Sequence, residues 1–222
     1  ANLKGNLITL HNQMRIHATK ETVEWIRNLI DVGVVNEVPI DNDYDIRVFD
    51  SPEELQSAIK EKNDNQSLGI SRLTATYDWE YSSQSKPKDS DYWCVRIGDW
   101  SCPWNRQLAK EKESKHLSWI EQSQTIHEIG STFTVQGFDL NYVGVIIGPS
   151  VKYRDGKIIF DISESKNKSA VQNRKLESGE MINYGETLLR NELNVLLTRG
   201  VNGLYVYAVD EELQQALKNA TK

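Results

Sequence analysis

Cysteine, proline and methionine are scarce in this chain of 222 residues, which contains two, five and two of them. Two cysteines cannot form the disulfide framework of a small secreted domain. Cys94 and Cys102 lie eight residues apart, with His116 well beyond them, which is poor spacing for a zinc site. We therefore expect two buried thiols, no metal site and a reducing, cytoplasmic location.

Long apolar runs and an excess of positive charge are also absent. No run approaches the roughly 20 apolar residues of a membrane span, and the first ten residues lack the layout of a signal peptide. Lys and Arg total 26 against 32 Asp and Glu, a net charge of −6. This balance excludes a uniformly basic nucleic-acid-binding protein but leaves a local basic groove open. Because the chain starts without an initiator methionine, we expect a piece of a longer protein.

Several signatures of catalysis are missing as well. The chain has no G-x-x-x-x-G-K-[ST] phosphate loop, no dinucleotide fingerprint, no H-E-x-x-H and no G-x-S-x-G. Residues 206–211 superficially resemble the strand and acidic pair that hold magnesium in P-loop ATPases. Without a phosphate loop, we interpret Asp210 as the N-cap of a final helix.

Strand and helix patterns alternate through the first third of the chain. Val23, Ile26 and Ile30 recur at helical spacing, and Ser51 followed by Pro52 and acidic residues is typical of a helix start. The predicted elements are a strand over 6–10, a helix from Thr19, a strand over 45–49, a helix over 52–62 and a strand over 67–76. This alternation predicts an α/β fold with a mainly parallel sheet covered by helices.

The same rhythm returns in the second half. The predicted elements there are strands over 131–135 and 142–147, a hairpin turning at Asp155-Gly156, a helix over 186–199 ending at Gly200, a strand over 204–209 and a helix from Asp210. Residues 142–147 form a near-continuous apolar run, which predicts a strand buried on both faces at the sheet centre. The polar segment 163–178, with four Lys and Arg residues, is interpreted as a mobile, solvated loop.

Residues 77–125 interrupt this rhythm and read as a β-rich insertion. Five of its aromatic residues, Trp79, Tyr81, Trp93, Trp100 and Trp104, form an aromatic segment. Exposed rings could stack on single-stranded bases, whereas buried rings would form a small local core. We favour the local core, because the acidic residues among the rings would repel phosphates.

Three segments carry a resemblance when they are taken together. They are 10–15 (LHNQMR), 131–139 (STFTVQGFD) with the following strand, and 194–200 (NVLLTRG) with the following strand. Their order and spacing resemble motifs IV, V and VI of the second RecA-like domain of superfamily 1 helicases. The match is closest to the Schlafen-group-3-like, helicase-related bacterial family, long carried as a domain of unknown function. Its Q-G-F-acidic-x-x-Y-V-G-V-I-I-G and L-L-T-R-G stretches both occur here, and the hairpin at 153–156 also fits.

The resemblance covers nearly the whole chain and is weakest over 30–125. It implies a single RecA-like, P-loop NTPase-type domain over 1–222, with 77–125 inserted in it. It also implies the carboxyl-terminal motor half of a nucleic-acid-dependent ATPase or helicase. ATP and Mg²⁺ would be bound mainly by an amino-terminal RecA-like domain of the same protein, and DNA or RNA, in single-stranded form, would be the partner.

The resemblance also implies roles for individual residues. Arg15 would contact the γ-phosphate of ATP, and Arg199 would be the arginine finger. Gln136 and Gly137 would match the Gln-Gly of motif V, and Asp139 would contact the ribose, at a position where the family more often has Glu. The residues that would offer hydroxyls to the nucleic-acid backbone are Ser131, Thr132 and Thr134. A fixed guanidinium suits phosphoryl transfer, because it neutralises developing charge.

Plainer interpretations of the same residues stay open. Arg199 could simply complement a helix dipole, Arg15 could be a surface arginine, and Gln136-Gly137 could be a plain turn. Two other functions also remain open: a non-catalytic RecA-like module that binds single strands or a protein through the aromatic segment, and a self-contained nuclease or hydrolase with its acids in the insertion.

Overall fold

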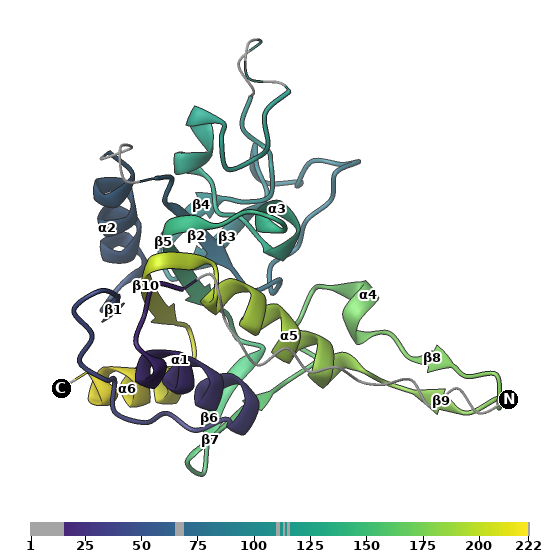
Figure 1. Ribbon diagram of the computed structural model, residues 1–222. Coiled ribbons are helices and arrows are strands. Elements are labelled where there is room, and N and C mark those ends of the chain that lie inside the picture. The colour runs from purple at the N-terminus through teal and green to yellow at the C-terminus, as the bar shows by residue number, and fades with distance from the viewer. Residues whose placement is uncertain (1–15, 65–68, 110–111, 113, 115, 222) are drawn as a thin grey trace, which may run out of the picture.

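Four parallel strands form the centre of the computed structural model, which describes residues 16–64, 69–109, 112, 114 and 116–221. Their order across the sheet is β1-β10-β5-β2, with β1 over Asp45–Val48, β10 over Gly200–Ala208, β5 over Leu140–Ile147 and β2 over Arg72–Ala75 (Figure 1). The expected α/β class with a parallel sheet is confirmed. The predicted strand over 6–10 and Arg15 lie outside the described residues.

The two inner strands, β5 and β10, are largely buried. Leu204 of β10 lies beside Val143 of β5, and Val206 lies beside Val145. All but one residue of β5 are buried. The prediction of a buried strand over 142–147 at the sheet centre is therefore confirmed.

Side chains of β5 alternate between the two faces of the sheet, and each face has its own core. Val143, Val145 and Ile147 face the core formed with helices α1 (Lys20–Arg27), α5 (Gly185–Leu197) and α6 (Glu211–Ala220). Ile146 faces the other core, which helix α2 (Pro52–Asp64) shares with the Trp-rich segment. The crossovers β1-α2-β2 and β5-α5-β10 run in opposite directions across the sheet. Right-handed connections therefore place α2 and α5 on opposite faces (Figure 1).

Predicted helix starts coincide with side-chain caps. The Thr19 hydroxyl accepts a hydrogen bond from the Thr22 backbone N–H at the start of α1. The Ser51 hydroxyl accepts from the Glu54 backbone N–H at the start of α2, and Asp210 accepts from the Leu213 backbone N–H at the start of α6. These bonds satisfy amide groups that the first helical turn leaves unpaired. The interpretation of Asp210 as a cap is confirmed. Helix α1 continues as a single π-helical turn over Asn28–Val32.

The Trp-rich segment packs as a local core on the second face of the sheet. Its strands β3 (Cys94–Ile97) and β4 (Trp100–Pro103) pair antiparallel, and a 3-10 turn over Ser123–His127 follows. Trp104 is fully buried, with ring centroids 4.9 Å from Tyr77 and 6.4 Å from Trp79. Tyr81, Trp93 and Trp100 are partly buried against the same core. This segment covers a sheet face that α2 alone leaves open.

One predicted strand is wrong. Residues 131–135 do not extend a strand, because helix α3 occupies Thr132–Val135. The Ser131 backbone N–H donates to the Thr134 hydroxyl at 2.8 Å. This local bond favours a helical turn over the extended form that the β-branched residues suggested.

The end of helix α5 also differs from the prediction. The helix ends at Leu197 rather than at 199, and Gly200 opens β10 instead of capping the helix. A Cβ on Gly200 would lie 2.0 Å from the Gly203 carbonyl oxygen, at the point where the register between β10 and β5 shifts. Glycine is required here by a close backbone approach in a bulge.

The remaining elements lie between β5 and α5. The predicted hairpin is present as β6 (Val151–Arg154) and β7 (Lys157–Phe160), and both turn residues have positive φ, 52° at Asp155 and 77° at Gly156. The segment expected as a loop over 163–178 contains helix α4 (Lys168–Val171) and strand β8 (Arg174–Lys175), which pairs with β9 (Met181–Ile182). No helix in the part of the chain that the structure describes has the length and apolar character needed to span a membrane.

Candidate functional site: a pocket between α3, α4 and α5

A pocket of about 380 Å³ lies between helices α3, α4 and α5. It brings together three residues to which the sequence assigned roles, namely Thr132, Gln136 and Arg199. The first and last of these are far apart in the chain and come from different elements. The other lining residues are Phe133, Asn167, Ser169, Ala170, Arg174, Leu188, Asn191, Glu192 and Val195. Two arginines and several amide and hydroxyl groups thus surround apolar walls, which is typical of small-molecule sites.

Helix α5 supplies one wall through its periodicity. Four pocket residues recur at spacings of four, three and four, so they lie on one side of α5 and of the two residues that follow it. They are Leu188, Glu192, Val195 and Arg199. Leu193, Leu196 and Leu197 are buried in the core that α5 shares with the sheet. The packing of α5 on the sheet therefore fixes which side of the helix faces the pocket.

Arg199 is held in place by backbone carbonyls and is only 7% exposed. Its Nε donates to the Val195 carbonyl oxygen at 3.2 Å, and its Nη1 donates to the Phe138 carbonyl oxygen at 3.1 Å. The first bond meets the last turn of α5, as the helix-dipole interpretation expects. The second joins the end of α5 to the loop before β5. The guanidinium is therefore fixed at the amino-terminal ends of β5 and β10, where the Leu140 backbone N–H also donates to the Arg199 carbonyl.

The motif V segment divides into buried and exposed parts. Gln136, Gly137 and Asp139 lie on an exposed loop, and Gly137 has a φ of 87°. The Ser131 hydroxyl donates to Asn105 Oδ1 at 2.7 Å, and the Thr134 hydroxyl donates to the Ser131 carbonyl at 2.9 Å.

Both of these hydroxyls are buried inside the chain. Of the three hydroxyl residues assigned to nucleic-acid binding, Thr132 lines the pocket, whereas Ser131 and Thr134 stabilise the turn that positions it.

Charge in the pocket is predominantly positive near neutral pH. Burial raises the pKa of Glu192 to about 8, with the nearby Asp78 carboxyl as a second cause. Glu192 is then largely uncharged, and the guanidinium groups of Arg174 and Arg199 dominate the lining. Such a pocket favours an anion with an apolar part. Sequence reasoning missed Glu192 and Arg174 as pocket residues. The signal for Glu192 was an acidic side chain seven residues before Arg199, between leucines that face the core.

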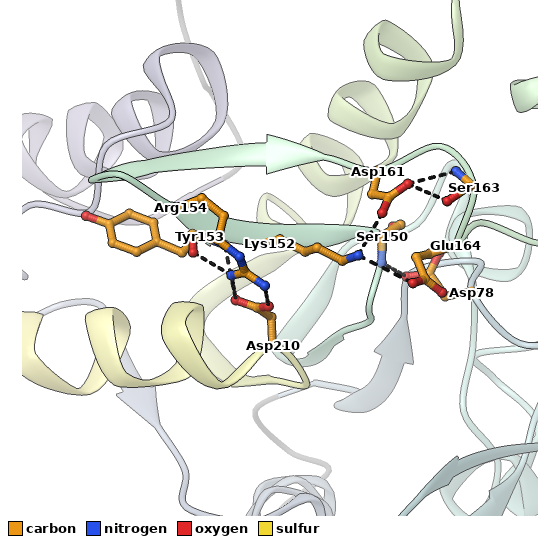
Figure 2. Close-up of polar contacts among 9 residues, drawn as sticks. All are labelled: Asp78, Ser150, Lys152, Tyr153, Arg154, Asp161, Ser163, Glu164 and Asp210. Atoms are coloured by element: carbon orange, nitrogen blue, oxygen red, sulfur yellow. Dashed lines mark hydrogen bonds and ion pairs between the residues drawn. The ribbon is translucent and has the colours of Figure 1, made fainter.

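Internal ion pairs lie on the segments that follow the carboxyl-terminal ends of β5 and β10 (Figure 2). Arg154 binds Asp210 through two bonds, Nη1 to Oδ1 at 2.9 Å and Nη2 to Oδ2 at 2.8 Å. Lys152 Nζ lies 2.7 Å from Asp161 Oδ2 and 3.3 Å from Glu164 Oε1. These contacts hold the β6-β7 hairpin to its surroundings, and Asp210 is committed to them and to its helix cap.

Metal ligation finds no support in the described part of the chain. No group of three or more His, Cys, Asp or Glu side chains that could hold a metal ion occurs there. Cys94 and Cys102 are free thiols, half-buried and buried, and burial raises the pKa of Cys102 to about 12. A thiol with so high a pKa is a poor nucleophile and a poor metal ligand at neutral pH.

Comparison with known proteins identifies a family that this chain matches over most of its length. A family model described as "Schlafen group 3, DNA/RNA helicase domain" matches residues 2–210. A curated relative, "Uncharacterized protein YPL245W" of Saccharomyces cerevisiae (strain ATCC 204508 / S288c), is 33% identical over 231 residues, which cover 96% of this chain and 48% of the relative. The chain thus spans about half the length of that relative. No solved structure matches the chain significantly.

Proposed function

The chain belongs to the Schlafen group 3 DNA/RNA helicase domain family, and we propose that it is the RecA-like, carboxyl-terminal motor half of a nucleic-acid-dependent ATPase. In this proposal an amino-terminal RecA-like domain of the same protein carries the phosphate loop. Arg199 as the arginine finger and Arg15 as a γ-phosphate contact both act on the ATP that is held between the two halves. The span of only about half of the yeast relative supports a longer parent protein.

The observation that carries the proposal is the meeting of Thr132, Gln136 and Arg199 around one positively charged pocket. These residues belong to two separate motifs, which meet because the neighbouring parallel strands β5 and β10 begin at the same end of the sheet. The fixed guanidinium of Arg199 matches the requirement of phosphoryl transfer for preorganised positive charge.

The described residues fit a phosphate-bearing ligand. Arg199 and Arg174 would face its negative charge, and the side-chain amide of Gln136 would donate a hydrogen bond. ATP itself supplies the phosphoryl group whose transfer to water drives the motor. This chain would orient that group and stabilise its charge. Mg²⁺ would be held by the other half, as would the β- and γ-phosphates.

Nucleic acid would contact the exposed part of motif V. Thr132 at the pocket and the loop with Gln136 and Gly137 are the accessible groups, whereas Ser131 and Thr134 would act only by holding α3. The aromatic side chains of residues 77–125 are largely packed against the second core. This packing disfavours the alternative of a stacking module for single strands.

The first test compares the full-length protein with this chain alone. We expect the full-length protein to hydrolyse Mg-ATP faster when single-stranded DNA or RNA is added. The 222-residue chain should show no turnover, because it lacks a phosphate loop to hold the β- and γ-phosphates. Steady-state phosphate release measures both. Magnesium-dependent turnover by the chain that disappears in an Arg199→Ala variant would reject the division into two halves.

A second expected result concerns binding by the chain alone. Its net charge is −6, so attraction to phosphates must come from few local cations and hydroxyls. We expect weak binding to a fluorescent single strand that decreases further as salt rises, with a log–log slope of about −2 if three phosphates are neutralised. Tight binding that persists at high salt would instead favour a stacking module built on the aromatic segment.

A further inference from the structure

Two buried carboxyl groups, of Glu192 in the pocket lining and of Asp78 beside it, have no catalytic or binding role in the function proposed above. Asp78 follows β2 and is 5% exposed, and Glu192 lies in the middle of α5 and is 7% exposed. The Tyr77 backbone N–H donates to Glu192 Oε1 at 2.7 Å. This bond ties α5 directly to the turn that carries Asp78.

Each carboxyl group has one oxygen that finds no hydrogen-bond partner among the described residues. Asp78 Oδ2 accepts from the Thr76 hydroxyl at 2.8 Å and from the Ser150 backbone N–H at 3.1 Å, at the carboxyl end of β5 (Figure 2). Asp78 Oδ1 and Glu192 Oε2 are buried, and neither has a hydrogen-bond partner among the described residues. Within the same part of the chain no cation forms an ion pair with either group. Two neighbouring carboxylates buried in this way cannot both stay ionised at low cost.

The surroundings do not supply the missing positive charge. Tyr77 and Glu164 interact with the pair, Lys152 pairs with Glu164, and Arg174 and Arg199 line the pocket with Glu192. Lys152 is engaged with Asp161 and Glu164, and Arg199 donates to two carbonyls. Burial raises the pKa of both carboxyls, and that of Glu192 reaches about 8. Geometry and electrostatics therefore agree that a proton resides on the pair at neutral pH.

We propose that Glu192 is a positioning residue, which holds α5 against the turn after β2 while it carries a proton and releases the helix when it ionises. The neutral group accepts the Tyr77 N–H bond without leaving an uncompensated charge in the core. Arg199 follows Glu192 by seven residues on the same side of α5 and its extension. Release of α5 would therefore also displace Arg199, and the importance of that displacement rests on the proposed function. The contact between α5 and the turn after β2 does not depend on the proposed function.

The sign of the pH dependence follows from linkage. The folded state holds a proton up to a pH of about 8, whereas an unfolded glutamate loses it near its ordinary value of 4.5. The stability that this proton confers is fully present below pH 4.5 and is lost as the pH rises to about 8. Asp41 and Asp161, with a lowered pKa of about 2, act only at much lower pH.

Urea unfolding of the 222-residue chain between pH 5 and pH 9 tests the proposal. The equilibrium constant for folding should fall by up to about tenfold per pH unit as the pH approaches 8, and then level off. Glu192→Gln keeps the acceptor oxygen without a charge, so its profile should be flat in this range. The matched control is Glu186→Gln on the same helix, whose exposed carboxylate pairs with Arg190, and it should follow the wild-type profile.

Two further measurements separate positioning from simple packing. Asp78→Asn removes the neighbouring like charge, so the Glu192 transition should move to lower pH. At pH 8.5, amides of α5 should exchange at least about tenfold faster in the wild type than in Glu192→Gln, whereas amides of α2 should exchange equally in both. A wild-type profile parallel to that of Glu192→Gln, or a Gln variant that is less stable at every pH, would overturn the proposal. Neither result bears on ATP hydrolysis.

Discussion

Arg199→Ala in the full-length protein should lower nucleic-acid-stimulated ATP hydrolysis by on the order of 10³-fold or more. The guanidinium is fixed by the carbonyl oxygens of Val195 and Phe138 at the ends of β5 and β10. A charge fixed in this way costs little to reorganise when the phosphoryl group departs. Arg199→Lys should restore little, because an ammonium lacks the planar fork that serves a backbone carbonyl and a phosphate at once.

Stability must be measured beside turnover, since Arg199 is mostly buried. Loss of its hydrogen bonds should cost about 1–3 kcal/mol of unfolding free energy, which leaves a folded protein for the assay. Arg190→Ala is the matched control: it removes a half-buried arginine of α5 that pairs with Glu186 and lies over the Phe160 ring, and its turnover should stay within about twofold of wild type. Near-normal turnover in both Arg199 variants would reject the arginine-finger role and leave the helix-dipole interpretation.

Most of the architecture was accessible from local sequence patterns. Ser51-Pro52 and Asp210 begin helices where the capping rules place them, and the apolar run of β5 lies between two cores. These features depend on neighbours in the chain. They can therefore be predicted without knowledge of the tertiary structure.

Features set by tertiary contact were not accessible in the same way. Gly200 looked like a helix stop, but it is required by its approach to the Gly203 carbonyl across a bulge. Residues 131–135 have strand-like composition, and a single bond from the Ser131 N–H to the Thr134 hydroxyl selects a helix instead.

The candidate site shows the same division. Motif spacing selected Thr132, Gln136 and Arg199, and the fold brings them together. The third wall of the pocket comes from α4, in a polar segment whose sequence predicted only a loop. The raised pKa of Glu192 arises because it is buried beside Asp78, more than one hundred residues away in the chain. No periodicity in the sequence predicts that Glu192 and Asp78 lie close together.

Arg72→Met should be the most destabilising of the substitutions considered, at roughly 3–5 kcal/mol of unfolding free energy. Arg72 is 3% exposed, and burial lowers its pKa to about 10, so it stays charged at neutral pH. Its guanidinium donates to five oxygens: Asn63 Oδ1 at 2.6 Å, Ile120 O at 2.6 Å, Ser71 O at 2.8 Å, Thr125 Oγ1 at 2.8 Å and Gln122 O at 3.2 Å.

Methionine would fill a similar volume but would remove the charged donor from all five acceptors, and loss of hydrogen bonds to buried polar groups is costly. Asn63 Oδ1 would keep the Ser71 N–H as a donor, and the Gln122 carbonyl would keep Thr125. Because Arg72 lies in β2 and three of its acceptors lie between 120 and 125, the loss should detach the end of the Trp-rich segment from the sheet. Urea unfolding gives the free energy, and the near-ultraviolet signal of buried Trp119 reports the detachment. Arg96→Met, at the exposed position of β3, is the control and should change stability by less than about 0.5 kcal/mol. An Arg72→Met protein within about 1 kcal/mol of wild type would mean that this charged anchor is dispensable, and that packing around Trp104 alone holds the segment on the sheet.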